Sequence, residues 1–267
     1  MKGIVKRNPP ENFLLWVNDY EKLNNTNTYS WANLRDINND ETRQRIVEEF
    51  GYCFEKKDLR LALLQEQGFI CCYCCKLLTN DRSIIIEHFK PRSNYPIEMF
   101  DYNNLHVCCS GIEIGDDGIQ IKPKHCGDAK DDKLEIIIEN VKVASIISPL
   151  EKEEEGFFVC EKSFLYDPSG NIFETENNTD ALFTINQLQL QHPQLIKARL
   201  LALEEAFPGI TETGYIDLDE KEAMIYLQHY TSPHLDNEDG ECKFEPFCNA
   251  VIFFLTQHLL LHAKTIS

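Results

Sequence analysis

The chain has 267 residues, of which 43% are hydrophobic and 26% charged, and its formal net charge is −18. This composition argues against disorder, and the length suffices to bury a hydrophobic core. There is no run of about 18 apolar residues to span a membrane, and the first residues, MKGIVKRNPPENF, lack the apolar segment of a secretory signal. We therefore expect a cytoplasmic globular protein without a membrane partner.

The acidic excess restricts the partners of the chain. Proteins that bind nucleic acid alone usually carry a basic excess, because contacts to phosphates supply most of the non-specific affinity. The field of this chain should instead repel a polyanion. Binding of nucleic acid therefore requires a local basic patch or a partner subunit.

The predicted elements begin with a polar lead-in and short helices over residues 1–60. Lys57–Gln67 has the composition of a helix that Gly68 would end. The β-branched run Ser83–Glu87 predicts a strand, and Gly111–Gly118 predicts a loop. Further strands are predicted at Ile119–Ile121, Lys133–Ala144, Phe157–Val159 and Phe164–Tyr166, with a turn at Asp167–Gly170.

The spacing of apolar residues becomes helical towards the C-terminus. His192–Phe207, Leu218–Tyr230 and Pro246–His262 are predicted helices. The last is apolar around much of its circumference, which favours a buried core helix over a partner-binding one. The sequence thus predicts an α+β fold in three parts: a helical lead-in over 1–60, a central module over 61–135, and accessory strands with C-terminal helices over 136–267.

Eleven cysteines need a chemical explanation, and seven of them lie between Cys71 and Cys126. A reducing cytoplasm and an odd count disfavour a disulfide framework. Metal binding is the better interpretation of the tight groups. The scattered cysteines, which we expect to be ordinary buried side chains, are Cys53, Cys160, Cys242 and Cys248.

The run Cys71–Cys75 contains two overlapping C-x-x-C pairs, formed by Cys71 with Cys74 and by Cys72 with Cys75. A C-x-x-C turn directs two thiolates at one ion, and zinc requires four ligands. The thiols available for the second pair are Cys108, Cys109 and Cys126.

Between these cysteine groups, a predicted strand ends in Glu87-His88. A lone histidine beside an apolar strand is more often structural than catalytic. Here, however, hydrolysis of a phosphodiester needs a base that works near neutral pH, and imidazole suits that role. The reaction also needs a cation on the phosphate, and Mg²⁺ or Mn²⁺ prefers oxygen ligands such as Glu87. Lys90, Arg92, Lys122, Lys124 and Lys130 surround the motif in sequence and are candidate phosphate-binding residues.

These motifs together resemble the HNH endonuclease family. The family's order of C-x-Y-C, acid-His, Asn-Leu and two further cysteines with a downstream lysine is reproduced here. Several features are similar to one branch, the PtuB HNH subunit of Septu-type and retron-associated antiphage systems. The resemblance runs from about residue 60 to about residue 205, and its segments include Glu87–Ser93, Asn104–Leu105, Cys109–Gly111, Tyr166–Ile172 and Thr184–Leu188, with Arg199 downstream.

The resemblance implies a ββα-metal nuclease core with a structural zinc. It assigns the zinc to Cys71, Cys74, Cys109 and Cys126. It makes His88 the general base, Glu87 a ligand of a catalytic Mg²⁺ or Mn²⁺, and Asn104 the residue that orients the His88 ring. It leaves Cys72, Cys75 and Cys108 as neighbours, although a ligand set shifted by one residue stays open.

The chain departs from the family directly after the last cysteine. The family has Asn, Asp or His there as a second ligand of the catalytic ion, whereas this chain has Gly127. Asp128 is the first substitute and His125 the second.

The sequence therefore predicts a metal-dependent HNH endonuclease that cuts nucleic acid, with DNA favoured over RNA. The resemblance alone implies a role in antiphage defence and a partner ATPase of the PtuA type. The alternative is a zinc module that mediates protein or nucleic-acid contacts without catalysis. A thiol-redox function is disfavoured, because no thioredoxin-like βαβ context surrounds the cysteine pair.

Overall fold

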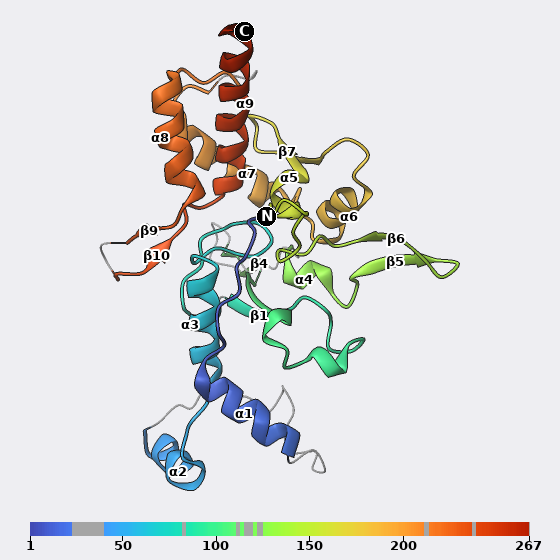
Figure 1. The fold of residues 1–267 in the computed structure, drawn as a ribbon, viewed down its shortest axis with the longest axis vertical. Coiled ribbons are helices and arrows are strands. Elements are labelled where there is room, and N and C mark those ends of the chain that lie inside the picture. Colours follow the sequence, from blue (N-terminus) through green and yellow to red (C-terminus); the bar gives the residue numbers. More distant parts are fainter. Residues whose placement is uncertain are drawn as a thin grey trace.

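The computed structural model describes residues 1–22, 40–81, 84–110, 113–114, 120–121, 125–210, 214–236 and 239–266. Over these residues the fold is α+β, with helices and two-stranded antiparallel sheets (Figure 1). The α-helices are α1 (Glu11–Lys22), α2 (Asp40–Phe50), α3 (Lys56–Glu66), α4 (Gly127–Lys130), α5 (Val159–Lys162), α6 (Thr179–Gln187), α7 (Pro193–Ala206), α8 (Glu220–Thr231) and α9 (Cys248–Ile266). The strands are β1 (Ile84–His88), β2 (Leu105–Cys109), β3 (Glu113–Ile114), β4 (Gln120–Ile121), β5 (Glu135–Ile138), β6 (Val141–Ser145), β7 (Phe164–Tyr166), β8 (Ile172–Glu174), β9 (His234–Leu235) and β10 (Cys242–Lys243).

The hairpin of β1 and β2 lies at the centre of the functional region. Its register pairs Ile84 with Cys109 at one end and His88 with Leu105 at the other. Residues 89–104 connect the two strands and include two short 3-10 helices, Pro96–Glu98 and Tyr102–Asn104. Because side chains alternate along a strand, Glu87 and His88 point to opposite faces of this hairpin.

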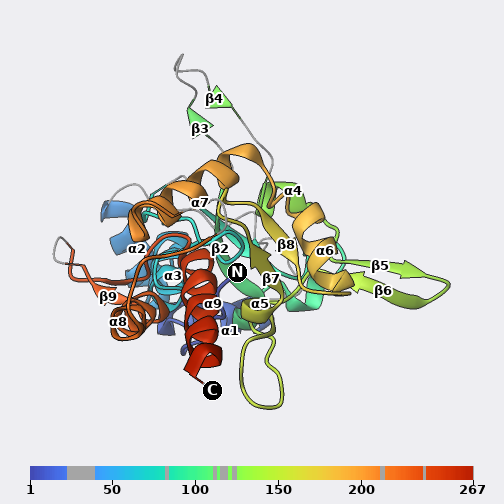
Figure 2. The same cartoon turned by 90° about the horizontal axis from the view of Figure 1, so that it is seen from above.

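The main hydrophobic core draws on all three predicted parts of the chain. It contains Phe13 from the lead-in, Leu63 and Val107 from the central module, and Leu195 and Phe247 from the C-terminal part. A second cluster joins α7, α8 and α9. Figure 2 shows α8 and α9 side by side on one side of the molecule, with the β5–β6 hairpin projecting on the other.

The structure confirms the predicted helices in the central and C-terminal parts. Helices α3, α7, α8 and α9 lie where periodicity and composition predicted them, with ends shifted by a few residues. Gly68, at a φ of 60°, follows α3 as expected. The turn at Asp167–Gly170 is also present, since the Gly170 amide donates to the Asp167 carbonyl at 3.0 Å. No helix among the described residues is long and apolar enough to cross a membrane.

Two strand predictions were wrong. Lys133–Ala144 is the hairpin of β5 and β6 rather than one strand, because Glu139 and Asn140 both adopt positive φ, at 50° and 65°. That pair of conformations is typical of a two-residue hairpin turn, and asparagine tolerates it well. Residues 157–159 form no strand: Phe158 makes an isolated bridge with Lys152, and Val159 begins α5. Most of Gly111–Gly118, with Ile119, lies outside the described residues.

The scattered cysteines differ in exposure. Cys160 and Cys248 are buried as expected, Cys53 is half-buried, and Cys242 is exposed. Cys242 lies in the short strand β10, whose hairpin with β9 stands away from the main core (Figure 1).

Candidate metal centre and the adjoining hairpin end

Four buried thiols meet at one point of the structure. They belong to Cys71, Cys74, Cys109 and Cys126, and their sulfur atoms all lie within 4.8 Å of one another. Residues 71–75 form a tight turn, in which the Cys75 amide donates to the Cys71 carbonyl at 3.0 Å. Cys109 is the last residue of β2, and Cys126 directly precedes α4. Segments far apart in the sequence thus supply the four sulfurs.

The sulfur spacing fits a tetrahedral zinc ion. Cys109 Sγ lies 3.7 Å from Cys71 Sγ and 3.8 Å from Cys74 Sγ. Zinc–sulfur bonds of about 2.3 Å in a tetrahedron place the sulfurs roughly 3.8 Å apart. A disulfide would instead bring two sulfurs to about 2.05 Å, and all of these cysteines are free thiols. The donor set therefore suits zinc in both chemistry and size.

His125 lies beside the sulfurs as well. Its Nδ1 is 3.3 Å from Cys126 Sγ and 3.7 Å from Cys109 Sγ, and burial lowers the pKa of the ring to about 4. A neutral imidazole at that place is a competing zinc ligand. The sequence also put His125 forward as a second ligand at Glu87, but these contacts place its Nδ1 against the sulfur cluster.

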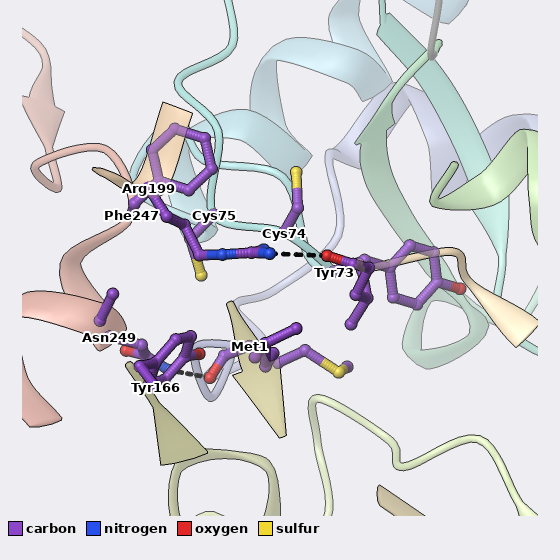
Figure 3. A pocket seen from close by; sticks show the side chains of 11 residues that line it. Met1, Tyr73, Cys74, Cys75, Tyr166, Arg199, Phe247 and Asn249 are labelled. Atoms are coloured by element: carbon purple, nitrogen blue, oxygen red, sulfur yellow. Dashed lines mark hydrogen bonds between the residues drawn. The ribbon is translucent and has the colours of Figure 1, made fainter. Parts of the chain in front are cut away.

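Arg199 lies close to the cysteine turn. Its guanidinium group is buried and donates to the Gly170 and Leu190 carbonyls, at 2.6 and 2.7 Å. A small cavity of about 10 Å³ separates it from the turn, and Figure 3 shows the side chain of Arg199 extending between Phe247 and Tyr73. Four thiolates around one Zn²⁺ carry a net charge of about −2, so a buried cation here offsets that charge.

Glu87, at the other end of β1, has its carboxylate turned inward. Its Oε1 accepts a hydrogen bond from the Tyr73 hydroxyl at 3.0 Å and an ion pair from the ammonium group of Lys130. Lys130 also donates to the carbonyls of His88 and Phe89. The side chain of Lys130 is only 2% exposed, so a direct contact with a phosphate, as predicted from sequence, would require this ion pair to open first.

His88 is held by the loop that connects β1 and β2. Its Nε2 lies 3.0 Å from the carbonyl oxygen of Met99. A carbonyl only accepts, so Nε2 carries the proton and Nδ1 bears the lone pair of the neutral ring. The pKa of His88 is lowered to about 4, chiefly because burial disfavours the charged ring; the contact with Met99 acts in the opposite direction, and the cations Arg92, Lys130 and Lys56 add to the lowering. The ring is therefore neutral at pH 7.

Asn104 fastens both ends of that loop. Its Oδ1 accepts from the Lys90 amide at 2.6 Å, and its Nδ2 donates to the carbonyls of Lys90 and Glu98, each at 3.0 Å. The resemblance implied that Asn104 orients the His88 ring. In the structure, the Asn104 carbonyl accepts from the amide of Phe89, the residue after His88, at 2.9 Å. The Asn104 side chain binds Glu98, and the next residue, Met99, contacts the His88 ring.

The candidate phosphate-binding residues separate into different settings. Arg92 is exposed and lies near enough to His88 to lower the pKa of its ring. Lys56, which is half-buried at the start of α3, lowers this pKa as well. Lys90 is paired with Glu98 at 2.7 Å. Lys122 and Lys124 lie outside the described residues. A local group of cations thus stands around His88 despite the acidic chain.

A catalytic divalent ion does not fit the residues around Glu87. Mg²⁺ is usually bound by one or two carboxylates together with water and phosphate oxygens, whereas one oxygen of this carboxylate is already engaged by Tyr73 and by the ammonium group of Lys130. Among the described residues, the four cysteines are the one group of three or more Cys, His, Asp or Glu side chains close enough to share an ion. Asp128, on the second residue of α4, does not join Glu87 in such a group.

The sequence did not predict the position of Lys56 near His88 or that of Cys108 beside Gly127. Lys56 approaches His88 through the packing of α3, which has no signature in the order of residues. Cys108 occupies the space beside Gly127: a Cβ at Gly127 would lie 2.6 Å from Cys108 Sγ and 3.0 Å from Glu87 Oε2. The glycine could be seen in the sequence as a departure, but its reason could not.

No protein-family model and no protein of curated function matches the chain. The functional assignment therefore depends on the residues and their geometry.

Proposed function

We propose that the chain is an HNH-type endonuclease that hydrolyses phosphodiester bonds in nucleic acid, with DNA favoured over RNA. The observation that carries the proposal is the imidazole of His88, whose Nε2 contacts the Met99 carbonyl at the end of a hairpin whose other end joins the sulfur cluster. Arg92 and Lys56 act on this ring electrostatically. The β1–β2 hairpin followed by α4 supports a ββα arrangement, with zinc on Cys71, Cys74, Cys109 and Cys126 as its staple.

In the proposed reaction, Nδ1 of His88 accepts the proton of the attacking water. A water molecule at His88 Nδ1 would lose its proton to the ring and attack the phosphorus. Arg92 and Lys56 would draw the phosphate towards this nitrogen. An approaching anion offsets the nearby cations and so raises the pKa of His88 towards the range in which a base is effective.

The proposal includes a partner. A chain with a net charge of −18 repels a polyanion beyond its immediate cationic group. We therefore propose that a partner ATPase of the PtuA type brings the substrate, in an antiphage defence system. This part rests on the resemblance of the motifs.

The direct test is cleavage of plasmid DNA and of RNA by the purified chain, alone and with the product of the neighbouring gene. Magnesium, manganese and a chelator are compared. His88→Ala should lose at least about 100-fold in rate, the usual contribution of a general base, with an unchanged zinc content. His229→Ala, at a partly exposed histidine distant in sequence, is the matched control. Absence of cleavage by the wild type in every pairing would refute the nuclease.

A non-catalytic zinc module is the second candidate function. The engagement of Glu87 Oε1 by Lys130 and the glycine at position 127 favour it. It predicts binding of nucleic acid or protein that depends on zinc but not on His88, so the same His88→Ala variant separates the two functions.

A further inference from the structure

The cation beside Glu87 belongs to the protein itself. The ammonium group of Lys130 has three hydrogens and meets three acceptors, the Glu87 carboxylate and the carbonyl oxygens of His88 and Phe89. The Phe89 ring covers it at 5.8 Å from the ring centre. Each donor is therefore used, and the charge is shielded from water.

Oε1 of Glu87 has two partners: the Tyr73 hydroxyl donates a hydrogen bond to it, and the ammonium group of Lys130 pairs with the same oxygen. Only about 10% of the Glu87 side chain is exposed. A divalent ion would have to displace the ammonium group and find further ligands in this interior.

At position 127, next to Glu87, there is no room for the side chain of such a ligand. A Cβ there would approach Cys108 Sγ to 2.6 Å and Glu87 Oε2 to 3.0 Å, both tighter than real side chains normally show. The place is filled by the Cys108 thiol rather than left open. Gly127 and Lys130, three residues apart on α4, thus both lie against the carboxylate of Glu87: Lys130 pairs with one oxygen, and Gly127 leaves space for the other.

We propose that Lys130 is the resident cation of Glu87 and takes the place of a divalent ion. Among the described residues, the sulfur cluster is then the one metal site, and Glu87 becomes a divalent-ion ligand only when the charge of Lys130 is removed. The bearing of this inference on catalysis rests on the proposed function, whereas its test measures metal binding alone.

The test is a titration of the zinc-loaded full chain with Mn²⁺, in which free Mn²⁺ is followed by its electron paramagnetic resonance and zinc content is monitored. The wild type and Glu87→Gln should show the same absence of a saturable site up to millimolar Mn²⁺. Lys130→Met should gain a site that disappears again in Lys130→Met/Glu87→Gln. Lys133→Met, an exposed lysine in the same segment, is the matched control and should resemble the wild type.

Two results would overturn the inference. One is saturable Mn²⁺ binding by the wild type that Glu87→Gln removes, and the other is a folded Lys130→Met protein with no new site. The first comparison uses the intact ion pair, so it decides the matter even where Lys130→Met does not fold. A chain that fails to cut nucleic acid but shows the predicted Mn²⁺ behaviour refutes the proposed function and leaves this inference standing.

Discussion

The two ends of the β1–β2 hairpin treat metal-binding residues differently. At the Cys109 end, four sulfurs from separate segments converge at the spacing of a zinc tetrahedron. At the His88 end, the carboxylate of Glu87 is already engaged by Tyr73 and Lys130. The comparison indicates that the type of side chain alone does not make a metal site. Neighbouring groups of the protein also have to leave the ligand atoms available.

Breaking the sulfur end should have the largest effect. Zinc at such a site contributes about 10–16 kcal/mol at neutral pH, so Cys74→Ser should lose zinc and unfold the region around residues 71–75. Cys72→Ser, in the same turn but outside the sulfur group, should keep its zinc. Metal analysis with thermal unfolding measures both. A full zinc content in Cys74→Ser would show that the ligand set is shifted.

Removing the hydrogen bonds by which Asn104 holds the loop beside His88 should lower the stability of the protein. Asn104→Ala removes three hydrogen bonds to Lys90 and Glu98. At about 1 kcal/mol each, the free energy of unfolding should fall by about 3 kcal/mol. Amide hydrogen exchange should also accelerate over residues 90–99. Asn103→Ala, at the exposed neighbour, is the control, and equal effects of the two variants in urea unfolding would contradict the role of Asn104.

Acid should weaken the His88 end through the ring itself. The folded pKa of about 4 lies below the ordinary value of 6.5, so the folded state favours the neutral ring. The contribution of the neutral ring to the free energy of unfolding is fully present above pH 6.5 and is lost as the pH falls towards 4. Between pH 7 and pH 5, the wild type should lose about 2 kcal/mol more stability than His88→Gln. Parallel losses in chemical unfolding at the two pH values would contradict the assignment.

The smallest effect is expected from a substitution at Gly127, which lies against Glu87 and Cys108. Gly127→Ala adds one methyl group against Cys108 Sγ and Glu87 Oε2, and overpacking of this size costs about 1 kcal/mol. The cost should shrink in a Cys108→Ala background, because the sulfur is the nearest obstacle. Urea unfolding of the four proteins in this double-mutant cycle measures the coupling. An unchanged cost would mean that the glycine is required for another reason.

The sequence predicted what is local and chemically specific. The spacing of the cysteines predicted a metal site, and the resemblance selected the four thiols that the structure brings together. Periodicity and composition identified α3, α7, α8 and α9. It did not predict that Lys130 pairs with Glu87, since that contact joins residues far apart in the chain through the packing of α4. The β5–β6 turn was missed for another reason: Glu139 and Asn140, which adopt positive φ, lie between two β-branched stretches whose composition predicts one strand.

X-ray absorption at the zinc edge of the purified chain tests the contrast most directly. We predict one zinc per chain with four sulfur ligands at about 2.3 Å and no nitrogen or oxygen in its first shell. A nitrogen at about 2.0–2.1 Å would show that His125 has replaced a thiolate. A second bound metal ion with oxygen ligands, lost in Glu87→Gln, would contradict the assignment of Lys130 as the cation at the other end of the hairpin.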